Sequence, residues 1–89
     1  LEISDFKIFE IYPNPVSDML TIPVVTPHGG DLKITLFDAS GAKIRIAYQD
    51  VVVGGLQLIQ IESRDLSPAL YSCTIEYDDQ VIIKKFIKN

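Results

Sequence analysis

The sequence predicts an all-β fold: a seven-stranded Ig-like β-sandwich that forms a single domain over residues 1–89. Residues 71–77 alternate strictly, the pattern of a half-buried strand, and one face of that strand carries Tyr71, Cys73, Ile75 and Tyr77. Turn residues recur about every ten positions, and no segment has a convincing helical period. Short strands separated by turns at this spacing are typical of a sandwich.

The first part of the chain predicts two strands joined by a rigid corner. Residues 6–11 alternate loosely and form the first expected strand. Pro13-Asn14-Pro15 ends it, because two prolines remove two backbone donors and keep the preceding residues extended. Residues 19–25 are the next expected strand, with inward side chains Leu20, Ile22 and Val24. Pro23 within it predicts a strand at an edge or with a bulge, since a central strand would lose a ladder hydrogen bond there.

The middle of the chain is predicted to form a hairpin followed by one further strand. Residues 31–38 and 43–50 flank the tight turn Asp38-Ala39-Ser40-Gly41, in which Gly41 can adopt a positive φ. The second arm is expected to place Ile44, Ile46 and Tyr48 on one face, with Lys43, Arg45 and Gln49 nearer solvent. After Gly54-Gly55, residues 56–62 form the next expected strand, with Ile59 and Ile61 inward.

The chain ends in a second predicted hairpin, residues 71–77 and 81–87 around Asp78-Asp79-Gln80. Ser67-Pro68 marks the corner before it. Tyr71 lies two positions before Cys73 and five after Leu66, which resembles the tyrosine corner of immunoglobulin-like sandwiches. The chain has one cysteine, so Cys73 is expected to be a buried thiol without a disulfide.

Charge is distributed unevenly along the chain. Residues 1–79 carry five basic and twelve acidic side chains, 5 − 12 = −7, whereas residues 80–89 carry only Lys84, Lys85 and Lys88, which gives +3 and a net charge of −4. Lysines commonly protect an edge strand from pairing with other chains. A basic, apolar terminal strand can also be a surface that a partner recognises, and both interpretations stay open.

Several functional classes are disfavoured by the composition. An acidic chain lacks the basic stripe that nucleic-acid binding requires, and its apolar stretches are too short to insert into a membrane. His28 is the only histidine, and no base is placed to activate Ser17 or Ser40, so no catalytic residue is expected. Asp78-Asp79 has no calcium-loop spacing. We expect no enzyme activity, no cofactor and no metal.

Three blocks of the chain occur in a fixed order: Tyr12-Pro13-Asn14-Pro15 followed by Leu20 and Ile22, then Leu36-Phe37-Asp38-Ala39-Ser40-Gly41, then residues 65–71 running to Lys84-Lys85-Phe86-Ile87-Lys88. Together they resemble the C-terminal sorting domain of the type IX secretion system of Bacteroidetes. Ala69 departs from the pattern, because the family usually has glycine there. If that position needs a positive φ, alanine costs about 1 kcal/mol.

The resemblance implies a non-catalytic signal that directs an N-terminally attached cargo protein through the periplasm to the cell surface or the medium. It implies translocon and sortase components as partners. The expected recognition residues are Pro13, Asn14, Pro15, Gly41, Tyr71, Lys84, Lys85, Phe86, Ile87 and Lys88. For Pro13-Asn14-Pro15, a purely structural corner is an equal alternative.

A second interpretation is a spacer or carbohydrate-binding module of a large extracellular enzyme, which should show surface aromatic residues, and the chain has no tryptophan. A dimer formed through an edge strand is a further expected partner interaction, although Pro23 and the lysines disfavour it.

Overall fold

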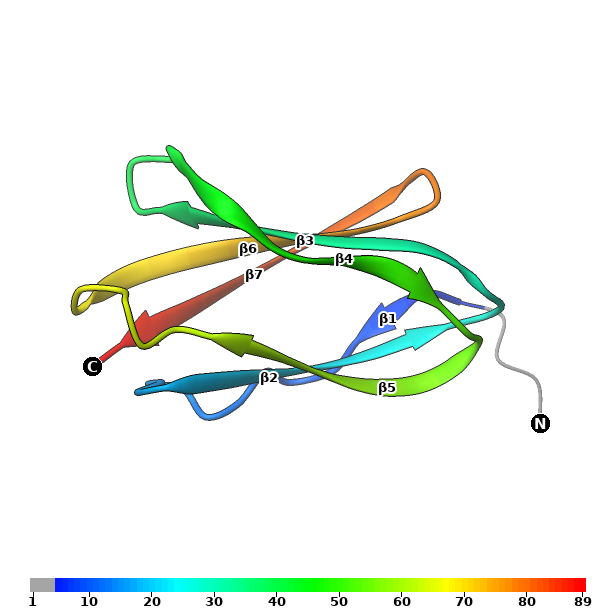
Figure 1. Cartoon of the computed structure of the whole chain (residues 1–89), viewed down its shortest axis with the longest axis horizontal. Helices are drawn as coiled ribbons and strands as arrows, with labels where there is room; N and C mark the ends of the chain where they lie inside the picture. The colour runs from blue at the N-terminus through cyan, green and yellow to red at the C-terminus, as the bar shows by residue number, and fades with distance from the viewer. Residues whose placement is uncertain (1–4) are drawn as a thin grey trace.

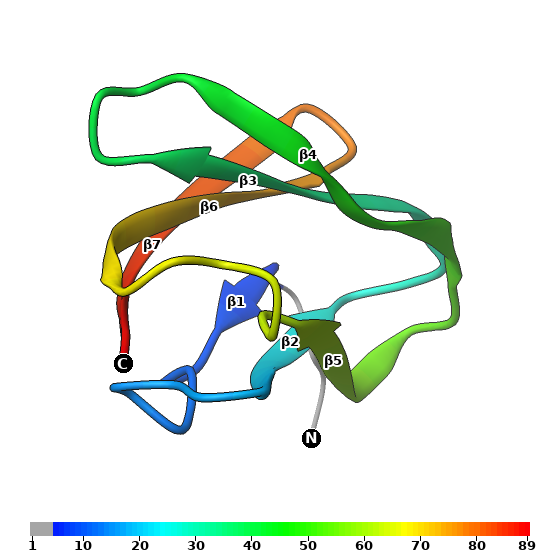
Figure 2. The same cartoon turned by 60° about the vertical axis from the view of Figure 1, so that its left-hand side comes forward.

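Seven strands form two antiparallel sheets in the computed structural model, which describes residues 5–89 (Figure 1). The strands are β1 (Lys7–Ile8), β2 (Met19–Thr26), β3 (Gly30–Asp38), β4 (Lys43–Val52), β5 (Gly55–Glu62), β6 (Ala69–Tyr77) and β7 (Gln80–Lys88). The sheets have the orders β1-β2-β5 and β4-β3-β6-β7 and are stacked as two layers (Figure 2). The predicted all-β Ig-like sandwich is confirmed.

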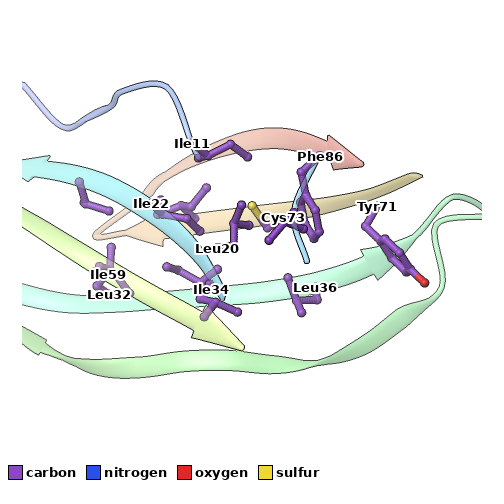
Figure 3. Packing of buried hydrophobic residues seen from close by; sticks show 14 of the residues in the cluster. Ile11, Leu20, Ile22, Leu32, Ile34, Leu36, Ile59, Tyr71, Cys73 and Phe86 are labelled. Atoms are coloured by element: carbon purple, nitrogen blue, oxygen red, sulfur yellow. The ribbon is translucent and has the colours of Figure 1, made fainter. Parts of the chain in front are cut away.

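The core fills the space between the two layers (Figure 3). As alternation predicts, β6 turns every second side chain inward, and those side chains are all buried: Tyr71, Cys73, Ile75 and Tyr77. The opposite layer supplies Leu20, Ile22, Ile59 and Ile61, which are also buried. Val24 is buried as well, so all five positions predicted to be inward on β2 and β5 are confirmed.

Pro23 does not place its strand at an edge, so that prediction is wrong. β2 lies between β1 and β5, and its pairing with β5 has no register shift. The Pro23 carbonyl accepts a hydrogen bond from Phe9 N–H at 3.0 Å, so the proline nitrogen faces the same side. Regular pairing on that side is confined to Lys7–Ile8, followed by one bridge between Tyr12 and Thr21. The missing donor therefore faces an irregular segment and breaks no continuous ladder.

The face assignment of β4 is also wrong. The register of β3 with β4 shifts between Ile34 and Thr35 and again between Leu36 and Phe37. Each shift interrupts the alternation of β4. Ile44 and Ile46 consequently lie exposed on the surface, whereas Tyr48 packs partly against the core.

The tyrosine corner and the turn between β3 and β4 are both formed by residues that are close together in sequence. Tyr71 donates its hydroxyl hydrogen to the Ser67 carbonyl at 2.6 Å, which confirms the predicted tyrosine corner. Gly41 has φ of 88°, as predicted. The Asp38 carboxylate accepts hydrogen bonds from the Ser40 side chain and from the Ala42 and Ser40 amides, which lower its pKa. Ala69 is not among the described residues with a positive φ, so the strain considered for it is absent.

Candidate functional site

The proline-flanked corner reaches across the molecule to the end of β7. The Asn14 side-chain Oδ1 accepts a hydrogen bond from Ile87 N–H at 2.8 Å. Val16 N–H then donates to the Ile87 carbonyl at 2.8 Å, and Asn89 N–H donates to the Val16 carbonyl at 2.9 Å. These contacts form a short parallel bridge between Val16 and Lys88. The last residues of the chain are thus held by β6 on one side and by residues 14–16 on the other.

Replacing Asn14 with alanine is expected to lower the free energy of unfolding by about 1 kcal/mol, because one hydrogen bond to the terminal strand is lost and water can solvate the freed amide. Chemical denaturation measures this loss. Asn14→Asp keeps an acceptor oxygen at the same place and serves as the control. If the aspartate variant is destabilised as much as the alanine variant, the Ile87 contact is not the cause.

A shallow pocket of about 150 Å³ lies on the outer side of the same end of the molecule. Its walls come from the Gly41 turn, the start of β6 and the middle of β7, and its lining residues are Asp38, Ala39, Gly41, Leu70, Tyr71, Ser72 and Lys85. The pocket therefore brings together residues from two sequence blocks that are far apart in the chain.

The pocket and the corner are parts of one surface. Leu70 lines the pocket and pairs in register with Ile87, whose amide is held by Asn14. Leu70 and Ile87 are both exposed. We name the set Asn14, Gly41, Leu70, Lys85 and Ile87 the terminal-strand surface. It lies at the end of the sandwich where the C-terminus is marked (Figure 1).

Comparison with known families decides what class of domain carries this surface. Residues 10–89 match the family model described as the secretion system C-terminal sorting domain. The chain belongs to that family. The sorting domain is accordingly a C-terminal sorting signal for type IX secretion, and its family is one of non-catalytic signal domains. The comparisons with curated proteins and with solved structures returned no match for this chain.

Membership in the family implies attachment to a cargo protein, interaction with the type IX secretion machinery, and export to the cell surface or the medium. Among residues 5–89 of the sorting domain, no helix is long and apolar enough to span a membrane. The same residues contain no group of three or more His, Cys, Asp or Glu side chains arranged to hold a metal ion.

The three terminal lysines of the sorting domain do not share one environment. Lys85 points outward and is exposed, Lys84 faces inward and is half-buried, and Lys88 also faces inward and is only 8% exposed. The expectation that all three are available to a partner is therefore wrong for Lys88, because alternation along β7 turns it toward the core. Inward-pointing charges protect edge strands, so Lys84 and Lys88 fit that interpretation. Lys85 is the one of the three whose side chain is exposed.

Two further expected recognition residues are part of the core. Phe86 is 1% exposed and Tyr71 is also buried, and their rings stack with centroids 5.7 Å apart and an interplanar angle of 24°. In the folded sorting domain they position the residues on either side of them. Pro13 and Pro15 flank Asn14 in the exposed corner.

Sequence reasoning missed three residues of this region. Val16 is fully buried, and its N–H and carbonyl bind Ile87 and Asn89 respectively. Leu70 adds an exposed apolar side chain beside Ile87 in the terminal-strand surface. A single valine after two prolines belongs to no repeating hydrophobic pattern, so the sequence gives no signal of this role.

Arg45 was expected nearer solvent, but it is half-buried. Its guanidinium binds the Asp65 carboxylate at 2.8 Å and the Glu62 carbonyl at 2.8 Å. This contact joins β4 to the β5 side of the sandwich.

The single histidine lies away from the terminal-strand surface, near the hairpin between β6 and β7. Tyr77 donates its hydroxyl hydrogen to the His28 carbonyl at 2.8 Å. An Asp78 carboxylate oxygen lies 4.0 Å from the His28 Nε2. These contacts attach the loop to the β6–β7 hairpin and serve the fold.

Proposed function

We propose that the terminal-strand surface is the part of the folded sorting domain that translocon and sortase components recognise. Recognition takes place in the periplasm, after which the cargo passes to the cell surface or the medium. The observation that carries this proposal is the convergence of Asn14, Gly41, Lys85 and Ile87 at one end of the sandwich. These residues belong to three sequence blocks, and only the fold makes them neighbours.

The position of the cargo supports the proposal. The first described core residue, Phe6, packs on Tyr77 with ring centroids 5.3 Å apart, and Tyr77 adjoins the hairpin at the far end of β7. The molecule is 40 Å long. Phe6 therefore lies toward the end of the sandwich that carries the β6–β7 hairpin, opposite the end of β7 that forms the terminal-strand surface (Figure 1), and this separation suits a receptor that approaches that surface.

The chemistry of the surface suits a protein partner. Lys85 offers an exposed ammonium group beside the apolar side chains of Leu70 and Ile87. The ladder with β6 uses alternate residues of β7, so Val81, Ile83 and Lys85 direct their backbone N–H and C=O groups toward the open edge. A partner strand could add to these groups while an acidic side chain pairs with Lys85.

The bridge to residues 14–16 fits the same role. It fixes the end of β7 before any partner arrives, so binding need not order that segment, and preordered surfaces bind with a smaller entropic cost. A rigid corner and a recognition element are then the same structure. This interpretation reconciles the two roles considered for Pro13-Asn14-Pro15.

Lys85→Glu is expected to reduce receptor affinity at least about tenfold, because a reversed charge would face the acidic groups of the partner. The assay fuses the chain to a periplasmic reporter in a type IX-competent bacterium and measures exported reporter. Lys7→Glu is the matched control, since it makes the same charge change on exposed β1 at the other end. Circular dichroism checks that both variants are folded.

Equal export of both folded variants would contradict the proposal. Deleting residues 84–89 is a poorer test, since it also removes Phe86 from the core.

One observation favours the alternative of a carbohydrate-binding or spacer module. Tyr71 and Tyr77 lie in the core, but Phe9 and Tyr12 are exposed aromatic side chains, and exposed rings can stack on sugars. Glycan binding by the isolated domain that is lost in Tyr12→Ala, together with export that does not depend on Lys85, would support this alternative.

A further inference from the structure

The sheets have four edges in the described chain, and three of them carry features that oppose pairing with the same edge of a second copy. β1 is two residues long, β4 contains two register shifts, and β7 carries lysines and is covered at its end by residues 14–16. The remaining edge strand, β5, differs. From Gly55 to Ile61 it has no charged residue and no proline, and its register with β2 is continuous.

The free backbone groups of β5 form a window with defined limits. Gly55, Gln57, Ile59 and Ile61 belong to the hydrogen-bonded pairs with β2, so the intervening residues Leu56, Leu58 and Gln60 direct their N–H and C=O groups outward. Gly55, with φ of 105°, begins the strand. At the other end the Glu62 carbonyl already accepts a hydrogen bond from the Arg45 guanidinium. Leu58 is the centre of the window.

The side chains of this window are apolar and exposed. Leu56 is 61% exposed and Leu58 is 58% exposed, on the outer face of the smaller sheet. Across the same face lie Pro23 and Val25 of β2, which are buried, and beyond them the exposed Phe9. An uncharged, continuous edge with leucines beside it is the kind of strand that pairs with another chain.

We propose that a second copy of this chain pairs antiparallel with β5. The two copies are related by a two-fold axis at Leu58, so that Leu58 faces Leu58 of the second copy and Leu56 faces its Gln60. Each facing pair exchanges two backbone hydrogen bonds. The two smaller sheets join into one, and the leucines of both copies lie on the same face.

The charge distribution makes β5 the edge at which a second copy can pair. Each chain has a net charge of −4, and two copies repel one another least where the facing residues are neutral. At β5 the paired residues are neutral, and the symmetric register places Glu62 opposite Gly54 of the second copy rather than opposite another carboxylate. A two-fold axis at Leu58 pairs every outward backbone group of Leu56, Leu58 and Gln60 with one of the second copy, which is the self-complementarity that an isologous contact requires.

The interface leaves the terminal-strand surface free. β7 and β4 are opposite edges of the larger sheet, and β4 leads directly into β5, so β5 lies on the side away from β7. Dimerisation is therefore independent of the proposed recognition function, and either can fail without the other.

Sedimentation of the 89-residue chain over a range of concentrations tests the dimer. Because the window is short, association is expected to be weak and to appear at high protein concentration. Leu58→Lys places two ammonium groups face to face and should weaken association on the order of tenfold or more. Val81→Lys is the matched control: Val81 is 56% exposed, and the change in net charge is the same.

Association by the natural chain and by Val81→Lys, but not by Leu58→Lys, supports the proposal. A chain that stays monomeric at all concentrations overturns it, and so does equal weakening by both substitutions.

A cross-linking experiment tests the register directly. With Leu58→Cys, facing residues of a hydrogen-bonded antiparallel pair bring the two Cα atoms within disulfide range, so mild oxidation should yield a covalent dimer. Val81→Cys is the control and should yield little. Cys73 is buried and does not compete. Equal yields from the two variants would refute the Leu58-centred pairing.

Discussion

Replacing Phe86 with alanine is expected to lower the free energy of unfolding by about 3–5 kcal/mol, the usual cost of removing a buried aromatic ring. The Phe86 side chain is fully enclosed and stacks on Tyr71, which is itself fixed by its hydrogen bond to Ser67. A domain of this size is stabilised by only about 5–15 kcal/mol in total, so the variant should be largely or partly unfolded at elevated temperature.

Urea denaturation followed by circular dichroism measures this loss, and Ile87→Ala is the control. Ile87 is the next residue and points outward, so its truncation should change stability by less than about 0.5 kcal/mol. A loss below about 1 kcal/mol for Phe86→Ala would show that the ring is not a core element. Reduced export by this variant would reflect unfolding, whereas reduced export by Lys85→Glu, which remains folded, would reflect recognition.

The stability of the domain is expected to fall as pH rises from about 9 to about 11, and Cys73 is the principal cause. Burial raises the pKa of its thiol from 9.0 to about 11, with smaller opposing effects from Lys84. Between these pH values the unfolded chain has released the thiol proton and the folded chain has kept it, so the folded state binds more protons. A rise in pH then favours unfolding, by roughly 2–3 kcal/mol for a shift of this size.

Cys73→Ala separates this contribution from other groups. Burial also raises the pKa values of Tyr48 and Tyr77, which contribute in the same direction. The informative quantity is therefore the difference in unfolding free energy between the natural chain and Cys73→Ala, measured at pH 8 and at about pH 11. The variant should lose less stability over this range. Parallel pH profiles for the two proteins would show that the thiol does not titrate with folding.

Much of this architecture could be predicted because it depends on neighbours in sequence. Strict alternation along residues 71–77 determines which side chains of β6 enter the core, and all of them do. The Tyr71 hydroxyl reaches a carbonyl only four residues away, and Gly41 adopts its positive φ within a single turn. Each of these features needs only a few residues of local geometry.

The errors arose where pairing with a distant strand overrode the local pattern. Ile44 and Ile46 alternate as core residues do, yet the register shifts against β3 leave them on the surface. Pro23 predicts an edge strand, yet β2 is central. The proline is tolerated there because the segment that its nitrogen faces is irregular. Lysine is usually a surface residue, yet Lys88 lies on the inward side of β7 and is buried.

The sequence alone determined the all-β class, the hairpins, the corner and the family to which this sorting domain belongs, because these depend on period, turn chemistry and ordered motifs. Only the tertiary structure decided that Asn14 binds the Ile87 amide 73 residues away, that Lys85 is the outward lysine, and that β5 is the unprotected edge. Contacts between distant segments depend on how strands pair and sheets stack, and no periodicity within one segment encodes that choice.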